Sequence, residues 1–497
     1  MDINIGSILE NRSVMMGEKV GFIHKDLQLT FSEMNDRANA VASYLQQIGL
    51  KEGDTIAILC KNNEHAIAIF FGAAKIGVIS TMVNWRLQKP ELEYILSHSE
   101  AKLIVFDGVF KDVIEQLKSS IPATHYLSNT TTAPTLFEVY NINANEPTYV
   151  TSGDKPILMM YTSGTTGKPK GALLSHNNLL ASSIGLSHTI SWYEEDRFLM
   201  VAPFFHIGGI APLMTNIHTG ATMILMEDFE PVKAWKLIEQ EQVTTMMTVP
   251  AMLAFLLKTV EVVKPDLSSI RNITCGASAV PAPLILACRK LGIPVQQVYG
   301  ITEYTGAVSF WKESQHIEKY DSMGKSVMHG KIEIVDPDTK EVLQQGDVGE
   351  IMLTGPQVFV GYYNNEEAYA ETVIDGKFYT GDVGYFDEQG FLYVVDRLKD
   401  MIISGGENIY SAELELALAT HPAISEVAVV GVPDEKWGEI PRAYIVKKEE
   451  TSLMEEEVIH YSKEKLASYK AIKEVLFVNQ LPRNAVGKVL KQRLVEI

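Results

Sequence analysis

A segment rich in glycine, threonine and lysine, residues 162–171, carries the side chains best suited to bind a phosphate. It follows residues 157–161, an apolar run that predicts a buried strand. Glycines let the backbone turn back and point its N–H groups at an anion, and lysines add positive charge. The spacing is not that of a Walker loop, because Pro169 stands where the Walker helix would begin. A flexible linker is the alternative, but linkers rarely follow a buried strand directly. The candidate phosphate-binding residues are Thr162, Ser163, Gly164, Thr165, Thr166, Gly167, Lys168 and Lys170.

A second candidate group, Tyr-Gly-Ile-Thr-Glu at residues 299–303, begins at the end of a predicted strand. A tyrosine ring can stack on a purine, Thr302 can donate to a phosphate, and Glu303 is a hard oxygen ligand suited to Mg²⁺. An ordinary capped turn would have the same composition. Because ligands of doubly wound sheets bind at the carboxyl ends of strands, we expect this turn to face the site.

Two shorter segments add weaker signals. Asp382 ends a Tyr-Thr-Gly-Asp run, and its carboxylate could accept from both hydroxyls of a ribose, although Thr-Gly-Asp occurs in many turns. Lys488 ends a Pro-Arg-Asn-Ala-Val-Gly-Lys run near the C-terminus, where a lysine is most often an exposed charge.

Taken together and in this order, the segments resemble the motifs of the adenylate-forming enzymes, which include acyl-CoA synthetases, firefly luciferase and stand-alone adenylation domains. The resemblance covers nearly the whole chain. It implies that a carboxylate reacts with ATP and Mg²⁺ to give acyl-AMP and pyrophosphate, and that coenzyme A then takes the acyl group. Lys488 matches the adenylation lysine, a sensible role because charge builds on both sides of the phosphorus.

The same resemblance implies roles for further residues. The implied catalytic residues are Lys488, Thr302, Glu303 and His206, with Glu303 also the metal ligand. The implied nucleotide contacts outside the phosphate loop are Gly276, Ala277, Tyr299, Gly300, Asp382 and Arg397. Lys399 matches the hinge about which a C-terminal domain rotates, and Gly405 and Gly406 match the wall of the tunnel for the thiol arm of CoA.

The run Pro-Phe-Phe-His-Ile-Gly-Gly at residues 203–209 resembles the acyl-pocket motif of the family. Amino-acid-activating members have an aspartate where this chain has His206, which argues against an amino acid substrate. Phe205 and Gly209 suit an apolar tail, fatty or aromatic, and the bulky Tyr304 could shorten the pocket. His206 could orient the carboxylate, gate the pocket, or be a packed core histidine. Ser411 stands where many members have proline.

The resemblance leaves several functional classes open. An acid–CoA ligase is favoured by residues 203–209 and by Gly405–Gly406. An acyl-AMP ligase that loads a carrier protein is the main alternative. A non-catalytic nucleotide-binding relative is disfavoured by Lys488 and Glu303, and no feature of the sequence indicates the oxygen chemistry of a luciferase.

The elements that must position these residues alternate between helix and strand. Thr30 and Glu33 predict a capping box at the start of a helix, and a further helix is predicted at residues 231–240. The predicted strands include residues 55–59, 101–106, 331–335, 349–354, 426–431 and 442–446. This alternation predicts an α/β fold: a large N-terminal domain of doubly wound sheets with a small β subdomain from Lys331 onward. A small mobile α+β domain would follow, with domain limits at 1–397 and 398–497.

Composition and charge limit the partners. Of the 497 residues, 46% are hydrophobic and 21% charged, as in an ordinary globular protein, and the net charge of −19 argues against nucleic acids, which require a basic surface. Three cysteines without metal-ligand spacing favour a reducing compartment. The start resembles no secretory signal, and the longest apolar stretch, residues 66–79, is too short to span a bilayer. We therefore expect a cytoplasmic enzyme that binds a small carboxylic acid and CoA, with a homodimer left open.

Overall fold

The computed structural model describes residues 3–130, 134–149, 152–162, 168–278, 280–404, 407–449, 451–468, 470–483 and 489–495. Its contacts divide the chain into two compact units. The first unit is Met1–Ile332 with Leu353–Phe378, and the second is Glu333–Met352 with Tyr379–Ile497.

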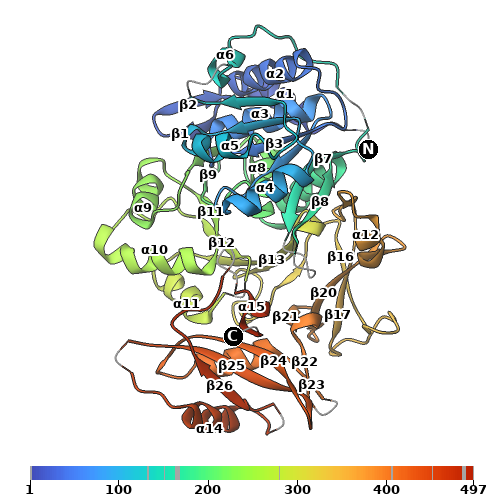
Figure 1. The fold of residues 1–497 in the computed structure, drawn as a ribbon. Coiled ribbons are helices and arrows are strands. Elements are labelled where there is room, and N and C mark those ends of the chain that lie inside the picture. The colour runs from blue at the N-terminus through green and yellow to red at the C-terminus, as the bar shows by residue number, and fades with distance from the viewer. Residues whose placement is uncertain are drawn as a thin grey trace. The chain divides into compact units, whose positions relative to one another are not determined.

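A nine-stranded sheet forms one half of the first unit, in the order β15-β14-β13-β12-β11-β9-β10-β1-β2 (Figure 1). The strands from β1 to β13 in this order are parallel, whereas β2, β14 and β15 pair antiparallel at the two ends. Their bounds are β1 (Val20–His24), β2 (Leu27–Thr30), β9 (Arg197–Met200), β10 (Thr222–Leu225), β11 (Thr245–Thr248), β12 (Asn272–Gly276), β13 (Val295–Ile301), β14 (Gly306–Lys312) and β15 (Lys325–Ser326).

A seven-stranded sheet forms the other half, in the order β18-β8-β7-β4-β3-β5-β6. Five neighbouring strands are parallel, and β8 and β18 extend the sheet antiparallel. The bounds are β3 (Thr55–Leu59), β4 (Ile79–Met82), β5 (Leu103–Phe106), β6 (His125–Ser128), β7 (Pro156–Thr162), β8 (Lys170–Ser175) and β18 (Gly361–Tyr362). The parallel cores of both sheets confirm the predicted doubly wound α/β class.

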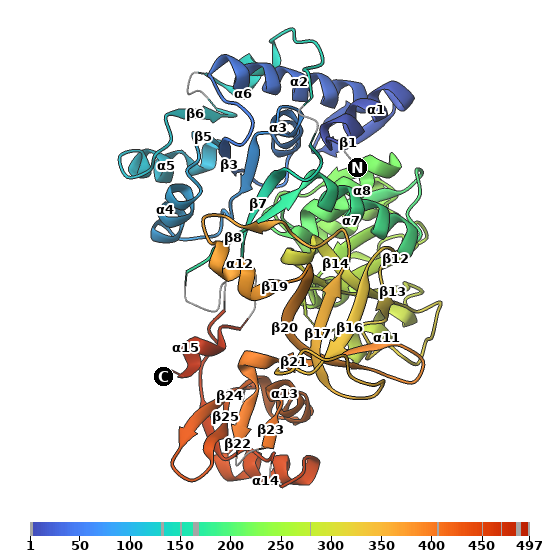
Figure 2. The ribbon, with the colours of Figure 1, turned by 90° about the vertical axis from the view of Figure 1, so that its right-hand side faces the viewer.

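Helices connect the successive parallel strands, because parallel strands must be joined by a crossover and a helix usually forms it. In Figure 2, α4 and α5 lie on one side of β3 and β5, and α2 and α3 lie on the other. Alternating residues of β3 and β5, such as Leu59 and Phe106, pack with Leu92 of α4 and Leu117 of α5. The helices and 3₁₀ turns of this unit are α1 (Gly6–Met16), α2 (Phe31–Gln47), α3 (Glu64–Lys75), α4 (Lys89–His98), η1 (Gly108–Phe110), α5 (Lys111–Leu117), α6 (Leu136–Tyr140), α7 (His176–Thr189), α8 (Ile207–Thr219), α9 (Pro231–Gln240), α10 (Pro250–Val263), α11 (Ala282–Lys290), η2 (Thr302–Tyr304) and α12 (Glu366–Thr372).

The sequence signals for local structure are confirmed where they are strongest. Thr30 Oγ1 accepts from Glu33 N at 3.2 Å and Glu33 Oε2 accepts from Thr30 N at 2.8 Å, so the predicted capping box starts α2. Among the helices of the described ranges, none is both long and apolar enough to traverse a lipid bilayer.

Most of two five-stranded sheets belongs to the second unit. One has the order β16-β17-β20-β19 with β21 on β20, and the other has the order β23-β22-β25-β24 with β26 on β25. The bounds are β16 (Lys331–Val335), β17 (Gly349–Thr354), β19 (Val373–Ile374), β20 (Lys377–Phe386), β21 (Leu392–Arg397), β22 (Ile402–Ser404), β23 (Glu407–Ile409), β24 (Ile424–Asp434), β25 (Gly438–Lys447) and β26 (Glu474–Phe477). Helical elements here are η3 (Leu398–Asp400), α13 (Ser411–Ala419), α14 (Glu455–Lys465) and α15 (Lys491–Val495).

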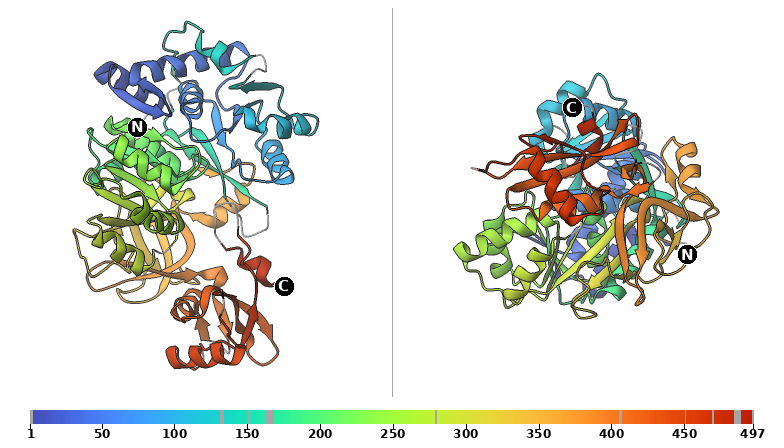
Figure 3. Two further views of the ribbon diagram at one scale, coloured as in Figure 1. Left: turned by 90° about the vertical axis from the view of Figure 1, so that its left-hand side faces the viewer. Right: turned by 90° about the horizontal axis from the view of Figure 1, so that it is seen from below.

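The second of these sheets, drawn in orange and red in Figure 3, is apolar on both faces. Val429 and Ile445 face a core with α13 and α14, whereas Val430 and Tyr444 face a core with Leu494 of α15. Because successive strand residues point to opposite faces, two separate cores can form on one hairpin. This sheet and its helices α13, α14 and α15 therefore form the α+β arrangement that the sequence predicts for the C-terminal segment.

Candidate active site

The phosphate-loop segment connects two antiparallel neighbours of the seven-stranded sheet. Thr162 is the last residue of β7, Lys170 is the first residue of β8, and the two are paired in register. Pro169 therefore leads into a strand rather than a helix, so the connection is unlike a Walker loop. The predicted residues Ser163, Gly164, Thr165, Thr166 and Gly167 lie outside the described residues.

A hydrogen bond joins this segment to the Tyr-Gly-Ile-Thr-Glu turn. Thr162 Oγ1 donates to Glu303 Oε1 at 3.1 Å, although Thr162 ends a strand of the seven-stranded sheet and Glu303 follows β13 of the nine-stranded sheet. Both side chains are half-buried. Two segments that the sequence predicts to bind phosphate and metal thus meet at the carboxyl ends of their strands.

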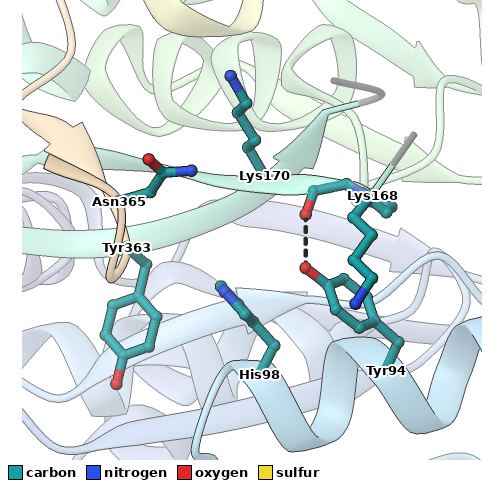
Figure 4. Close-up of a pocket in the computed structure, with 7 residues that line it drawn as sticks. Tyr94, His98, Lys168, Lys170, Tyr363 and Asn365 are labelled. Carbon is teal, nitrogen blue, oxygen red and sulfur yellow. Dashed lines mark hydrogen bonds between the residues drawn. The ribbon is translucent and has the colours of Figure 1, made fainter. Parts of the chain in front are cut away.

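The two lysines after the phosphate loop point to different places (Figure 4). Lys168 turns toward Tyr94 of α4, with Nζ 5.7 Å from the ring centroid, whereas Lys170 turns the opposite way and lies 5.4 Å from the ring centroid of Tyr362. Both lysines line a pocket of about 320 Å³, and the Tyr94 hydroxyl donates to Pro169 O at 3.1 Å beside it. Of the two predicted phosphate ligands, Lys170 is therefore the one on the side of Glu303, which hydrogen-bonds to Tyr362.

Gly276 and Ala277, two of the predicted nucleotide contacts, lie beside Tyr299, the tyrosine predicted to stack on a purine. β12 and β13 are parallel neighbours, and Gly276 at the end of β12 is paired with Val298, one residue before Tyr299. A Cβ on Gly276 would lie 2.3 Å from Val298 Cγ1, so only glycine allows this close approach. Ala277 has a φ of +68°, a left-handed conformation that costs a residue with a side chain roughly 1–2 kcal/mol. Strain of this kind is concentrated at ligand sites.

Gly300 and the residues after it complete this edge of the sheet. A Cβ on Gly300 would lie 2.7 Å from Gly306 O, and the β13–β14 register shifts between Tyr299 and Gly300. Thr302 and Glu303 follow in the short 3₁₀ turn η2, which turns the chain out of the sheet.

Asp382 and Arg397, the predicted ribose and phosphate contacts, form an ion pair in the second unit. They face each other across β20 and β21, with Arg397 Nε 3.2 Å from Asp382 Oδ1. Gly381 has a φ of +71°, and its N–H donates to Glu350 Oε1 at 3.0 Å, which fixes the turn before Asp382. An aspartate held this way presents its carboxylate in one orientation to a diol.

Replacing Asp382 by asparagine is expected to raise the KM for ATP roughly 10- to 100-fold, since hydrogen bonds to a charged group contribute about 1.5–3 kcal/mol. The measurement is pyrophosphate release at varied ATP. Asp338→Asn, in an exposed turn of the same unit, is the control and should leave the KM unchanged. A normal KM in Asp382→Asn would contradict the ribose assignment.

His206 lies at the N-terminus of α8 as its N-cap residue. Within the described part of the chain, its buried Nε2 has no hydrogen-bond partner, which is costly unless a ligand supplies one. Burial, with a smaller effect of the Arg86 charge, lowers the pKa of His206 to about 4. The imidazole is therefore neutral near pH 7 and can exchange a hydrogen bond with a ligand without contributing positive charge.

The residues predicted to line an acyl pocket have different surroundings. Phe205 is buried against Trp85, edge to face at 5.8 Å. Gly209 has no room for a side chain, because a Cβ would lie 2.3 Å from Pro203 O. Tyr304 is buried and its hydroxyl donates to Thr354 O at 2.8 Å. Backbone packing therefore accounts for Gly209 and a buried hydrogen bond for Tyr304, and their contact with an acyl tail stays a prediction.

The predicted hinge Lys399 lies in η3, directly after the Asp382–Arg397 pair. Met401 N donates to Arg397 O at 3.0 Å and closes this turn. The other residues of the predicted second half-reaction, Gly405 and Gly406, and the predicted catalytic Lys488 lie outside the described residues. The predicted domain boundary between 397 and 398 also stays a prediction.

Two features of the site region escape sequence reasoning. Tyr362 donates to Glu303 Oε1 at 2.9 Å. Ser411, noted only as a departure from the family pattern, donates from Oγ to Asp396 Oδ2 at 2.8 Å and accepts from Lys491 Nζ at 2.6 Å. Ser411 thereby connects the segment before the hinge to the helix that follows the Lys488 loop.

One carboxylate, that of Glu303, fits a magnesium ion carried by ATP. Among the described residues, no group of three or more histidine, cysteine or acidic side chains could hold a metal. Mg²⁺ in nucleotide sites keeps several waters and binds phosphates plus one or two carboxylates. Glu303, half-buried beside the phosphate loop, meets this requirement.

Comparison with known proteins places the whole chain among nucleotide-dependent ligases. The family model for the AMP-binding enzyme matches residues 9–363, and the model for the AMP-binding enzyme C-terminal domain matches residues 413–488. A long-chain-fatty-acid–CoA ligase of Mycobacterium tuberculosis is 34% identical over 99% of this chain and 98% of its own. A 2-succinylbenzoate–CoA ligase of Bacillus cereus is 35% identical over 98% of this chain and 97% of its own.

The fold is shared with a solved structure of similar function. The o-succinylbenzoate coenzyme A synthetase of Bacillus subtilis, in complex with ATP and magnesium ion, has a TM-score of 0.87 and 33% identity, and the match covers 98% of each chain.

Proposed function

The chain belongs to the family of AMP-binding enzymes, and from this premise we propose that it is an ATP-dependent acid–CoA ligase. The first reaction joins a carboxylate to AMP and releases pyrophosphate. In the second, the thiol of CoA attacks the acyl carbon, a thioester forms and AMP leaves. Curated relatives over nearly the full length are CoA ligases, which favours CoA over a carrier protein as acceptor.

The observation that carries this proposal is the hydrogen bond between Thr162 and Glu303. It brings the phosphate loop and the metal-binding turn together from two different sheets. An acid and ATP bound at such a junction would have the α-phosphate between a basic loop and a carboxylate-bound cation.

In the proposed adenylation reaction, each of these residues has a separate role. Lys170 and the phosphate loop hold the ATP phosphates, Thr302 donates to a phosphate oxygen, and Asp382 holds the ribose. Glu303 would hold the Mg²⁺ that accompanies ATP, and the chemistry this ion would supply is neutralisation of the charge that develops on the phosphates during transfer. Lys488 would stabilise the same charge from the acid side.

The thioester reaction uses different residues from the same C-terminal region. Rotation about Lys399 would withdraw Lys488 and bring Gly405 and Gly406 to the acyl-AMP, where glycines leave space for the thin thiol arm of CoA. A single site would then perform two reactions with two faces of one mobile domain.

The acid is apolar, either fatty or aromatic. The relatives reported above include a long-chain-fatty-acid–CoA ligase and a 2-succinylbenzoate–CoA ligase. The buried aromatic environment of Phe205 and the neutral imidazole of His206 suit a tail without positive charge. The free Nε2 of His206 is suited to hydrogen-bond an oxygen of the acid or of the acyl-AMP.

We also infer a cytoplasmic location and small-molecule partners. ATP and CoA are the co-substrates, the net charge of −19 disfavours nucleic acids, and the three described cysteines are buried and free, as in a reducing compartment. A homodimer stays a prediction.

The test is pyrophosphate release across a panel of short, medium and long fatty acids and aryl acids, each with and without CoA. We expect CoA-dependent turnover with one class of apolar acid. Acyl-AMP formation that CoA does not discharge would move the function to carrier-protein loading. If the enzyme releases no pyrophosphate from ATP with any of these acids, the proposed ligase function is contradicted.

A further inference from the structure

One oxygen of the Glu303 carboxylate receives two hydrogen bonds from side chains distant in the sequence. Thr162 Oγ1 donates at 3.1 Å and Tyr362 Oη donates at 2.9 Å, both to Oε1. Within the described residues, no hydrogen bond reaches Oε2 of this carboxylate. The two oxygens are therefore not equivalent, and Oε2 is the one left for another partner.

The backbone around Tyr362 holds its hydroxyl in place from both sides. Strand β18 pairs antiparallel with β8, where Tyr362 faces Ala172, and Tyr363 N donates to Gly171 O at 2.8 Å. On the other side, Phe359 N donates to Glu303 O at 2.9 Å. The segment from 359 to 363 thus binds both the strand after the phosphate loop and the backbone of Glu303.

The Tyr362 side chain has a polar contact at its hydroxyl, which donates to Glu303 Oε1 at 2.9 Å, and a second contact at its ring. Lys170 Nζ lies 5.4 Å from the centroid of the Tyr362 ring. One tyrosine therefore contacts the predicted metal ligand through its hydroxyl and the phosphate-binding lysine through its ring.

We propose that Tyr362 is a positioning residue that orients Glu303 so that Oε2 binds the magnesium of Mg-ATP, a role that rests on the proposed function. Mg²⁺ requires nearly ideal octahedral geometry and gives up water reluctantly. A ligand carboxylate held by neighbouring hydrogen bonds meets this requirement better than one free to rotate. Tyr362 also connects Glu303 to β8, the strand that begins with Lys170, because its own strand is paired with β8.

The test is the Mg²⁺ dependence of ATP binding in Tyr362→Phe, measured by calorimetry without any acid substrate. Phenylalanine keeps the ring near Lys170 and its contact with Phe359, whose centroid is 4.8 Å away, and removes only the donor. We expect the Mg²⁺ concentration for half-maximal ATP binding to rise about tenfold, the effect of one hydrogen bond to a charged group. ATP binding in EDTA should stay at the wild-type value, and thermal stability without metal should fall by no more than the loss of this one hydrogen bond accounts for.

Tyr363→Phe is the matched control, because the neighbouring hydroxyl donates to Glu100 Oε2 at 3.1 Å instead of to Glu303. It should leave the Mg²⁺ dependence unchanged. In a Glu303→Gln background, Tyr362→Phe should add no further change, since it acts through that carboxylate.

Unchanged Mg²⁺ dependence in Tyr362→Phe, an equal shift in Tyr363→Phe, or a full additional shift in the Glu303→Gln background would each overturn the proposal. Wild-type ATP binding that does not depend on Mg²⁺ would overturn it as well. Because the binding measurement needs no acid, a shift in Tyr362→Phe together with silence across the acid panel would reject the ligase while supporting the role of Tyr362.

Discussion

Replacing Lys488 by alanine is expected to lower acyl-AMP formation roughly 10²–10³-fold or more, as the loss of a group that stabilises transition-state charge does in other enzymes. Thioester formation from supplied acyl-AMP and CoA should stay near the wild-type rate. The physical reason is that only the first reaction builds charge around phosphorus, whereas the second breaks a bond at the acyl carbon. The two half-reactions are measured separately, by pyrophosphate release and by thioester formation.

A lysine of the same unit provides the control for Lys488→Ala. Lys473 is exposed beside β26, and its backbone N–H donates to Pro441 O at 3.0 Å. Lys473→Ala removes a comparable surface charge and should leave both half-reactions unchanged. Equal loss of the two half-reactions in Lys488→Ala would refute the assigned role, since it would indicate general damage to the C-terminal region.

The local structure of this chain was predictable where its sequence pattern is regular. The strand at Thr55–Leu59, the helix at Pro231–Gln240 and the strands at Lys331–Val335 and Gly349–Thr354 have the predicted bounds. Short apolar runs between turn residues define such strands, and an amphipathic repeat defines the helix. Because consecutive βα units must form a parallel sheet with covered faces, the architecture follows from the order of elements.

The ends of the long C-terminal hairpin were not predictable in this way. β24 runs over Ile424–Asp434 and β25 over Gly438–Lys447, beyond the predicted strands at 426–431 and 442–446. The additional paired residues include Pro433 opposite Glu439 and Asp434 opposite Gly438. Proline, aspartate and glycine signal a turn in the sequence, but pairing between the two strands overrides that signal.

The site shows the same limit more sharply. The motifs around Thr162 and Glu303 predict a phosphate loop and a metal ligand, and the two meet through a hydrogen bond of 3.1 Å. Tyr362, however, lies in a two-residue strand without periodicity. Its contact with Glu303 arises from the pairing of β18 with β8, a long-range event that no local pattern encodes. Likewise, the sequence predicts that Gly209 lines an acyl pocket, but no local pattern shows that a Cβ at this residue would lie 2.3 Å from Pro203 O.

If Lys399 is the hinge that we propose, replacing it by proline is expected to block thioester formation, by roughly hundredfold or more, while acyl-AMP formation continues, because the proposed rotation changes the backbone conformation at this residue. Lys399 lies in the 3₁₀ turn η3, whose φ values are typically close to the −65° that proline imposes. Proline at this position therefore imposes a φ close to that of a 3₁₀ turn and removes the rotation about φ that would reach another conformation. The measurement is acyl-AMP accumulation compared with acyl-CoA production by the same enzyme sample.

The control separates the backbone of Lys399 from its charge. Lys399→Ala removes the ammonium but keeps φ free, so CoA turnover should stay within about threefold of wild type if the residue acts as a hinge. A loss of thioester formation in both variants would assign the effect to the side chain instead. Normal CoA turnover in Lys399→Pro would reject the hinge, since a residue with φ fixed could not be the pivot between two conformations. Thioester formation lost only with proline would locate the conformational step in the turn that follows the Asp382–Arg397 pair.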